Sequence, residues 1–141
     1  MSAGCWHAAG VGIDELLEHS RRGVRQLAPH EVADAAARGA LIVDTRTERQ
    51  RREQGEFPGA IVIDRTVLEW RLDPKSDEHI PEASDYDVEI VVVCRQGYSS
   101  SIAAATLRAL GLHRATDLAG GVEAWIEAGR PMSTAPADVR L

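Results

Sequence analysis

An apolar run that ends at a cysteine constrains the fold of this chain more than any other feature. The four branched residues 90–93 predict a fully buried strand, whereas the alanine-rich stretch 102–110 is too long for another strand and predicts a helix. Cys94 opens the short segment that joins them. A strand that feeds a helix through a tight loop is typical of an open α/β sheet, in which ligands bind at the carboxyl ends of the strands.

The segment that begins at Cys94 has the parts of an anion-binding loop. Backbone N–H groups of a tight loop and the N-terminus of a helix both attract negative charge. Arg95 adds a positive charge, and Gly97 permits the positive φ that lets the loop curl. Ser99 and Ser100 offer hydroxyls to cap the helix or to donate to an anion. A thiol in such surroundings ionises readily, so we interpret Cys94 as a nucleophile rather than as a buried structural cysteine.

The rest of the chain alternates between short apolar runs and helical patterns. Buried strands are predicted at residues 41–44, 61–63 and 115–118, and helices around residues 13–17, at 29–38 and at 122–128. Residues 46–54 are charged enough to predict a solvated helix or loop, and residues 73–87 predict a surface excursion. Strands that alternate with helices require right-handed crossovers, so we expect an α/β fold with a mainly parallel sheet covered on both faces.

The composition fits one compact domain and limits the partners. A chain of 141 residues with 44% hydrophobic residues can bury one sizeable core but not a second. The net charge of −6 and the dispersed arginines argue against nucleic acid as a partner. Residues 1–12 lack the pattern of a signal peptide and no apolar stretch approaches a membrane span, so we expect no membrane partner and a cytoplasmic location.

The cysteines and histidines show no metal-binding pattern. Cys5 and Cys94 could form one disulfide, but a reducing compartment would keep both thiols free. None of the histidines has metal-ligand spacing; they are His7, His19, His30, His79 and His113. We therefore expect no metal ion.

Four ordered segments of this sequence resemble the rhodanese-like sulfurtransferases. They are Val43-Asp44-Thr45-Arg46, Phe57-Pro58-Gly59-Ala60, the loop from Cys94 to Ser99, and the segment from Leu118 to Trp125. The resemblance covers residues 27–131 and implies a three-layer rhodanese-like domain with a five-stranded, mainly parallel sheet and helices on both faces. Residues 1–26 are then expected to be an N-terminal extension with a short helix, and residues 132–141 a C-terminal tail.

The resemblance implies a sulfurtransferase in which Cys94 carries a persulfide. The Cys94 thiolate would take a sulfane sulfur from thiosulfate or a persulfide and pass it to a thiol or cyanide, with no cofactor. The expected partners are a small sulfur donor or a protein persulfide and a thiol acceptor, and the protein is expected to be a monomer or homodimer. The loop N–H groups would point at the terminal sulfur. The loop residues expected to bind substrate are Arg95, Gln96, Gly97, Tyr98 and Ser99.

The same resemblance assigns roles outside the loop. Asp44 and Arg46 are expected to be structural, because charge-assisted hydrogen bonds between them would tie loops together near the active edge. Arg65 and Arg71 follow a predicted strand, and either is a candidate substrate-facing arginine. Trp70 is interpreted as a core residue.

Two alternatives stay open at this point. A cysteine-dependent phosphatase or arsenate reductase uses a similar loop, but such sites typically need an arginine after five intervening residues, and Ser100 stands there. The other alternative is a carrier or sensor domain in which Cys94 becomes persulfidated without turnover. Within the sulfurtransferase interpretation, Gln96 stands where thiosulfate-preferring members commonly have a lysine, so persulfides are alternative donors.

Overall fold

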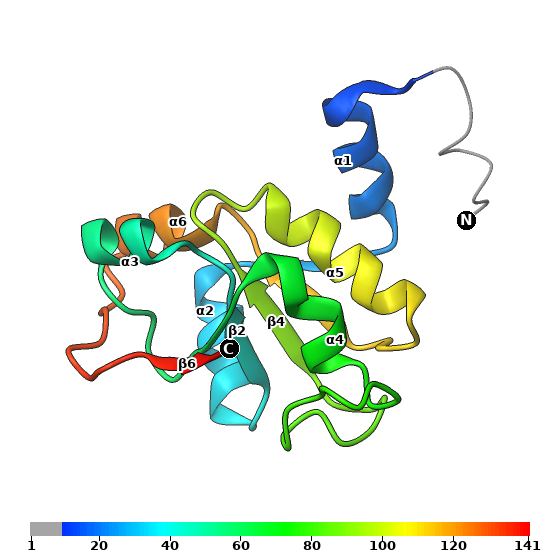
Figure 1. Cartoon of the computed structure of the whole chain (residues 1–141). Coiled ribbons are helices and arrows are strands. Elements are labelled where there is room, and N and C mark those ends of the chain that lie inside the picture. Colours follow the sequence, from blue (N-terminus) through cyan, green and yellow to red (C-terminus); the bar gives the residue numbers. More distant parts are fainter. Residues whose placement is uncertain (1–9) are drawn as a thin grey trace.

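Six strands build one sheet in the computed structural model, which describes residues 10–141 (Figure 1). They are β1 (Gln26–Leu27), β2 (Leu41–Asp44), β3 (Ile61–Ile63), β4 (Ile90–Val93), β5 (Ala115–Leu118) and β6 (Asp138–Arg140). The strands pair in the order β1-β5-β4-β2-β3-β6, and each of these pairings is parallel. The predicted α/β class and parallel sheet are confirmed.

The sheet has one strand more than the five that the resemblance implied. β6 lies in the segment expected as a C-terminal tail and pairs with β3. β1, at the opposite edge, has only two residues. Strands of two or three residues are too short to show an alternating pattern, and the charged Asp138 and Arg140 that flank Val139 are typical of an edge strand.

Helices cover both faces of the sheet, as predicted (Figure 1). On one face, α4 (Leu68–Leu72) and α5 (Ser99–Ala109) pack with β4 residues Ile90 and Val92 into one core. On the other face, α2 (Pro29–Ala37) and α6 (Gly121–Glu127) pack with Val91 and Val93 into a second core. The expectation of a single core is therefore wrong, because the sheet separates the buried apolar residues into two layers. β4 lies at the centre of the sheet and is buried on both faces, which is why its sequence is an unbroken apolar run.

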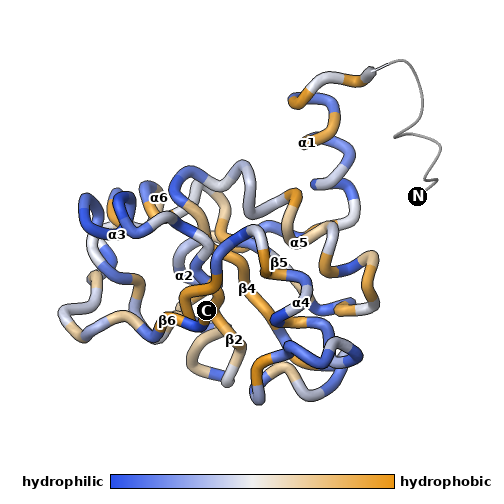
Figure 2. Tube along the Cα trace, viewed as in Figure 1, coloured by the Kyte–Doolittle hydropathy of each residue, from blue (hydrophilic) through white to orange (hydrophobic). Residues whose placement is uncertain are grey.

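The two remaining α-helices contribute little to these cores. α3 (Glu48–Gln54) is hydrophilic along its length (Figure 2), and only Arg51 in it is buried. Thr47 caps it by accepting a hydrogen bond from Gln50 N at 3.2 Å, so this charged stretch is a helix rather than a loop. α1 (Gly12–Arg22) buries only Ser20 and projects from the body over α5 (Figure 1). Within residues 10–141, every helix is too short or too polar to cross a membrane.

The interpretation of Trp70 as a core residue is wrong. Its side chain is 59% exposed. α4 follows a 3₁₀ turn (Arg65–Val67) and buries Leu68 and Leu72, which are four residues apart and so share one face of the helix. Trp70 lies midway between them and therefore points to the opposite, solvent side.

Candidate active site

Cys94 lies directly after β4, at the carboxyl edge of the sheet. Its side chain is buried, with 6% exposed. The backbone N–H of Gly97 donates to Cys94 Sγ at 3.1 Å, and Sγ lies 3.2 Å from Ser100 Oγ. The loop therefore curls back over its own first residue, so that a backbone dipole and a hydroxyl both contact the sulfur.

Close packing between the Cys94 loop and the Gly120-Gly121 turn allows this curl. Gly97 has φ +86°, and a Cβ there would lie 2.7 Å from Gly120 N. Gly121 has φ +64°, and a Cβ there would lie 2.6 Å from the carbonyl oxygen of Arg95. Neither position accommodates a side chain without backbone movement, which explains why the loop and the Gly120-Gly121 turn both need glycine.

Two backbone hydrogen bonds from the first turn of α6 hold the same loop. The N–H of Val122 donates to the Cys94 carbonyl at 2.9 Å, and the N–H of Glu123 donates to the Arg95 carbonyl at 3.1 Å. These carbonyls satisfy N–H groups that are left free at a helix N-terminus. The carbonyl groups of Cys94 and Arg95 therefore face α6.

A pocket of about 220 Å³ opens beside the Cys94 sulfur. Four of the five loop residues expected to bind substrate line it, and Gly97 contacts the sulfur directly. The lining also includes Thr45 and Gln50, which the sequence analysis did not identify. The lining residues are Thr45, Arg46, Gln50, Cys94, Arg95, Gln96, Tyr98 and Ser99.

The predicted helix cap at Ser99 or Ser100 is absent. α5 begins at Ser99, and its N-cap residue Tyr98 makes no side-chain capping bond. Ser99 lines the pocket, whereas the Ser100 hydroxyl points into the protein and donates to Asp117. Tyr98 is 60% exposed at the pocket, with its ring 5.9 Å from the guanidinium of Arg21.

A carboxylate lies among the polar side chains at the edge of the pocket. Glu123 Oε2 lies 3.6 Å from Arg95 Nε and accepts a hydrogen bond from Gln96 Nε2 at 3.2 Å. Both Arg95 and Glu123 are about half exposed. The positive charge that Arg95 offers to an anion is therefore partly neutralised before any substrate binds.

Asp44 and Arg46 form a fully buried ion pair next to the pocket. Arg46 Nη2 lies 2.7 Å from Asp44 Oδ2, and Arg46 Nε lies 3.1 Å from Asp44 Oδ1. The guanidinium also donates to the Gly55 carbonyl at 2.9 Å and to Gln54 Oε1 at 3.2 Å. These contacts join the end of β2 to the end of α3, and Arg46 also lines the pocket. A purely structural role for this pair stays a prediction.

Arg65 and Arg71 are engaged away from Cys94. Arg65 Nη1 donates to both carboxylate oxygens of Glu69, at 2.9 and 2.8 Å, and Arg71 Nη1 donates to the Glu78 carbonyl at 2.9 Å. Neither arginine is among the residues that line the Cys94 pocket. A substrate contact by either of them stays a prediction.

A buried aspartate network beneath the loop was not anticipated. Asp117, on β5, has no exposed surface, and both Ser100 and Ser101 donate to its Oδ2 at 2.8 Å. Burial raises the pKa of this carboxyl above its usual value, while hydrogen bonds from Ser101, Ser100 and Gln26 lower it. The signal in the sequence was an acidic residue inside a strand predicted to be buried.

Arg21 on α1 donates hydrogen bonds to the Cys94 loop and to the start of α5. Arg21 Nη2 donates to the Gly97 carbonyl at 2.8 Å, and its Nε donates to Ser101 Oγ at 3.1 Å. Gln26 Nε2 reaches the same hydroxyl at 3.2 Å. No sequence signal linked Arg21 to a loop 76 residues away, because the contact depends on how α1 docks on α5.

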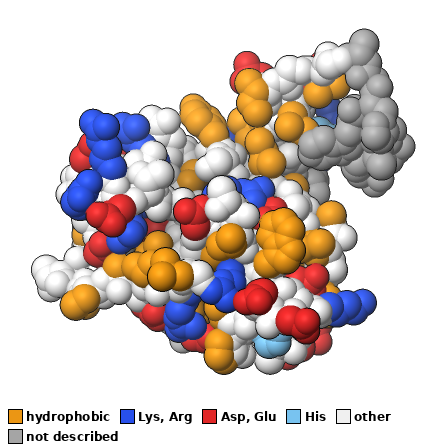
Figure 3. All heavy atoms as spheres, in the orientation of Figure 1, with side chains coloured by type: hydrophobic (Ala, Val, Ile, Leu, Met, Phe, Trp, Pro, Cys, Tyr) orange, Lys and Arg blue, Asp and Glu red, His pale blue; other side chains and the backbone are white. Residues whose placement is uncertain are grey.

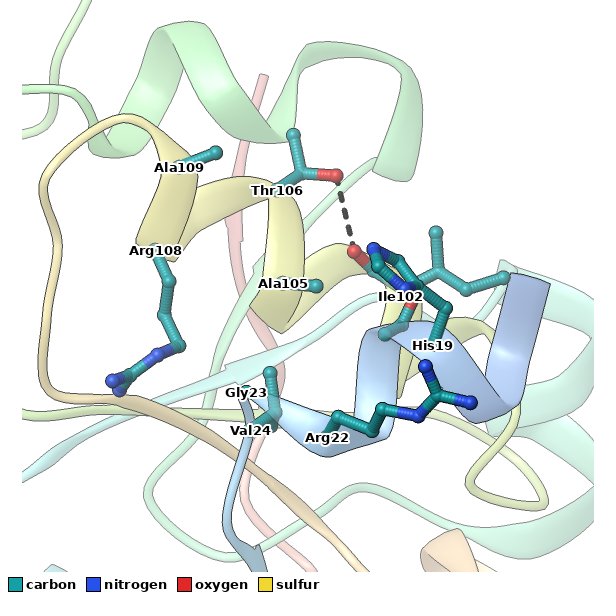
Figure 4. A pocket seen from close by; sticks show the side chains of 10 residues that line it. His19, Arg22, Gly23, Val24, Ile102, Ala105, Thr106, Arg108 and Ala109 are labelled. Atoms are coloured by element: carbon teal, nitrogen blue, oxygen red, sulfur yellow. Dashed lines mark hydrogen bonds between the residues drawn. The ribbon is translucent and has the colours of Figure 1, made fainter. Parts of the chain in front are cut away.

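A larger hollow lies elsewhere, between α1 and α5 (Figure 4). It encloses about 780 Å³ and has mostly apolar walls, with His19 and Arg22 from α1 facing Ile102 and Ala105 from α5. It contains none of the residues predicted to act on a substrate. The smaller pocket is the candidate active site because Cys94, the predicted nucleophile, lines it.

The described residues form no evident metal site, and the face shown in Figure 3 has no basic surface. No three His, Cys, Asp or Glu side chains within residues 10–141 lie close enough to hold a metal ion together. On the face shown in Figure 3, Lys and Arg side chains are interspersed with Asp and Glu. That face has no continuous basic patch of the kind that binds polyanions.

The sequence of this chain is similar to one known protein family and to several known proteins. The family model described as "Rhodanese-like domain" matches residues 28–128. The chain is 30% identical to the thiosulfate sulfurtransferase GlpE of Pseudomonas fluorescens over 101 residues, which are 72% of this chain and 84% of that protein. It is 32% identical over 85 residues, or 60% of its length, to the adenylyltransferase and sulfurtransferase UBA4 of Candida albicans, but spans only 19% of that protein.

A solved structure from Rhodopseudomonas palustris matches more of the chain. This is the protein RPA3614, described as of unknown function and as a possible tyrosine phosphatase. It superposes with a TM-score of 0.80 and 29% sequence identity, over 89% of this chain and 97% of that one.

Proposed function

Because this chain belongs to the family of rhodanese-like domains, we propose that it is a sulfurtransferase that carries sulfane sulfur as a persulfide on Cys94. The observation that carries the proposal is the position of the Cys94 sulfur. It lies at the carboxyl edge of the sheet, beside a pocket of about 220 Å³, and accepts a hydrogen bond from Gly97 N at 3.1 Å. Relatives named as sulfurtransferases support the reaction class.

The reaction consists of two displacements at one sulfur atom. The Cys94 thiolate attacks the outer sulfur of the donor, the new S–S bond forms, and the donor's S–S bond breaks with its electron pair leaving on sulfite or on a thiolate. An acceptor thiolate or cyanide then attacks the outer sulfur of the persulfide and restores the Cys94 thiolate. Splitting the transfer in this way predicts ping-pong kinetics. The Gly97 N–H stabilises negative charge on the sulfur.

The charges at the pocket favour a persulfide over thiosulfate as the donor. Thiosulfate carries two negative charges, whereas a small thiol persulfide carries one at its reacting sulfur. Gln96 adds no positive charge, and the Glu123 carboxylate lies 3.6 Å from Arg95 Nε. Of the two arginines in the lining, Arg46 is paired with Asp44 and Arg95 is partly neutralised by Glu123. A dianion would therefore meet little uncompensated positive charge, which weakens its binding.

The test compares wild-type protein with Cys94→Ala. Each reduced protein is incubated separately with thiosulfate and with glutathione persulfide, and intact mass is measured before cyanide or a thiol is added. We expect wild-type protein to gain one sulfur atom and to lose it to the acceptor over many turnovers. Cys94→Ala should gain none. Cys5→Ala is the matched control, since it removes the other cysteine and should keep full activity.

Three results would change the conclusion. If neither donor adds sulfur to Cys94, the catalytic proposal is wrong. If sulfur is added once but no acceptor removes it, the domain is a persulfide carrier or sensor. Faster turnover with thiosulfate than with glutathione persulfide would contradict the proposed donor preference.

A cysteine-dependent phosphatase is a second candidate because RPA3614, which covers 89% of this chain, is described as a possible tyrosine phosphatase. Such an enzyme clamps the phosphate with an arginine after five intervening residues, and here Ser100 stands there and faces Asp117. We expect no Cys94-dependent hydrolysis of p-nitrophenyl phosphate. Turnover that disappears in Cys94→Ala would favour the phosphatase.

The proposed partners follow from the same site. A pocket of about 220 Å³ suits a small persulfide or the end of a protein persulfide chain as donor and a thiol as acceptor. We propose a cytoplasmic setting, because a reducing compartment keeps Cys94 available as a thiol.

A further inference from the structure

A buried carboxyl group lies two hydrogen bonds from the Cys94 sulfur. Cys94 Sγ donates to Ser100 Oγ at 3.2 Å, and Ser100 Oγ donates to Asp117 Oδ2 at 2.8 Å. Ser100 and Asp117 have no exposed surface. The three groups therefore form a continuous path for a proton from the thiol to the carboxylate.

The surroundings of Asp117 disfavour its ionised form. Its Oδ2 accepts hydrogen bonds from Ser100, from Ser101 and from Gln26 on β1, whereas Oδ1 is buried without a partner among the described residues. An ionised carboxylate places charge on both oxygens, so an unpartnered buried oxygen costs the ion more than the neutral acid. Burial raises the pKa of Asp117, and the charge of Arg21 on α1 acts in the opposite direction.

The single proton of the Ser100 hydroxyl couples the two ends of the path. While Asp117 is ionised, this proton points to Oδ2, and Ser100 can only accept from the sulfur, which favours the thiol. When Asp117 is neutral, its own proton can point to Ser100, and the Ser100 proton can turn to the sulfur and stabilise a thiolate. Each protonation state at one end therefore selects the state at the other.

We propose that Asp117 is a positioning residue that shares one proton with Cys94 through Ser100. The S–H bond of Cys94 breaks with its electron pair left on sulfur, and the proton joins Ser100 Oγ as the Ser100 proton moves to Asp117 Oδ2. A thiol and a carboxylate become a thiolate and a carboxylic acid, with no proton lost to solvent. The inference rests on the proposed function only in taking Cys94 as the reactive group.

The test is the pH dependence of Cys94 alkylation by iodoacetamide, followed by intact mass. The alkylation rate of an independent thiol falls about tenfold for each pH unit below its pKa. When two groups share one proton, the thiolate fraction is constant over the pH range in which the pair holds that single proton. The alkylation rate of wild-type protein should therefore show a flat step, independent of pH, between two ranges in which the rate rises with pH.

Two serine variants form a matched pair. Ser100→Ala and Ser101→Ala each remove one 2.8 Å hydrogen bond to Asp117, but only Ser100 also contacts the sulfur. We expect Ser100→Ala and Asp117→Asn to lose the flat step and to show one tenfold-per-unit slope. Ser101→Ala should keep the step, displaced to higher pH because a bond that lowers the Asp117 pKa is gone.

Two results would overturn the proposal. One is a single tenfold-per-unit slope in wild-type protein, which needs no variant to fold. The other is equal profiles in the two serine variants. Infrared absorption gives a second measurement: on acidification into the step, the S–H band and a carboxylic-acid band that is missing in Asp117→Asn should rise together. Because alkylation measures Cys94 without sulfur transfer, failure here leaves the proposed sulfurtransferase activity standing, and the reverse also holds.

Discussion

Gly97 is the residue on which the geometry around the Cys94 sulfur most depends. Its positive φ brings its own N–H to the sulfur, and its missing Cβ lets the loop approach the backbone at Gly120. Both features belong to the same residue, so a substitution at Gly97 affects both contacts. The loop therefore has no tolerance for a side chain at this position.

Gly97→Ala should destabilise the protein more than Gly59→Ala. Both glycines have positive φ, but a Cβ at Gly59 meets nothing within 4 Å, whereas at Gly97 it would lie 2.7 Å from Gly120 N. We expect the free energy of unfolding to fall by about 1 kcal/mol in Gly59→Ala and by about 2–4 kcal/mol in Gly97→Ala. Urea denaturation measures both. Sulfur transfer should be lost only in Gly97→Ala, and equal losses of stability would contradict the steric argument.

Glu123 is the residue that we expect to set the charge preference of the pocket. Glu123→Gln frees Arg95 from a carboxylate 3.6 Å away, so it should raise kcat/KM for thiosulfate relative to that for glutathione persulfide. The pair is half exposed, which limits the change to about two- to fivefold. Steady-state kinetics with both donors measures this ratio.

Glu127→Gln is the matched control for this charge change. Glu127 lies one turn further along α6 and, among the described residues, forms no ion pair with Arg95, so its removal should leave the ratio of the two donors unchanged. A ratio that stays constant in Glu123→Gln, or that moves equally in both variants, would remove Glu123 from the explanation of donor preference.

Among the elements, β5 combines structural and chemical roles. Ala115 and Leu118 belong to the two cores, while Asp117 places a carboxyl group beneath the Cys94 loop. A buried carboxyl with a raised pKa binds its proton more tightly in the folded chain than in the unfolded chain. The stability that this proton provides is present below the unfolded pKa of about 3.9 and is lost as pH rises through the folded pKa.

The unfolding free energy of wild type, relative to that of Asp117→Asn, should therefore fall as pH rises from about 4. Asp138→Asn is a control with the opposite sign, because Arg140 lowers the pKa of Asp138. Its carboxylate stabilises the folded chain above the unfolded pKa, and this contribution is lost as pH falls. Urea denaturation at a series of pH values measures both slopes, and a slope of the same sign in the two variants would contradict the assignment.

Across the whole molecule, α1 is an addition to a body that has its cores without it. Its one buried residue is Ser20, whereas both cores lie between the sheet and helices α2, α4, α5 and α6. Arg21 nevertheless connects α1 to the Cys94 loop through the Gly97 carbonyl and to the start of α5 through Ser101. α1 should therefore matter more for activity than for stability.

Deleting residues 1–22 and substituting Arg21→Ala should have similar effects on activity. Each removes the same two hydrogen bonds, to the Gly97 carbonyl and to Ser101 Oγ. We expect kcat/KM for sulfur transfer to fall about tenfold in both variants. Arg22→Ala is the control, since this neighbouring side chain is 69% exposed and, within residues 10–141, pairs only with Glu18 on the same helix. The thermal midpoint should change little in all three variants. A loss of activity in the deletion that exceeds the loss in Arg21→Ala would give α1 a further role.

The sequence determined the features that depend on local pattern. The apolar run 90–93 predicted a strand buried on both faces, and the glycine and serine residues after it predicted a loop that contacts the sulfur. The apolar helices were predicted for the same reason, since burial and periodicity leave a trace in neighbouring residues. The charged stretch 46–54 was predicted only as a helix or a loop, and the structure shows a helix there. The four ordered motifs then identified the family, because their order and spacing along the chain match those of a rhodanese-like domain.

Only the tertiary structure decided contacts between residues far apart in the chain. Arg21 reaches Gly97, Glu123 neutralises Arg95, and the strand at 138–140 pairs with β3, although none of these pairings leaves a local pattern. Trp70 shows the same limit, since its exposure depends on which face of α4 meets the core. Asp117 was visible as an acid in a buried strand, but its link to Cys94 exists only because the serines at the start of α5 lie between the ends of β4 and β5.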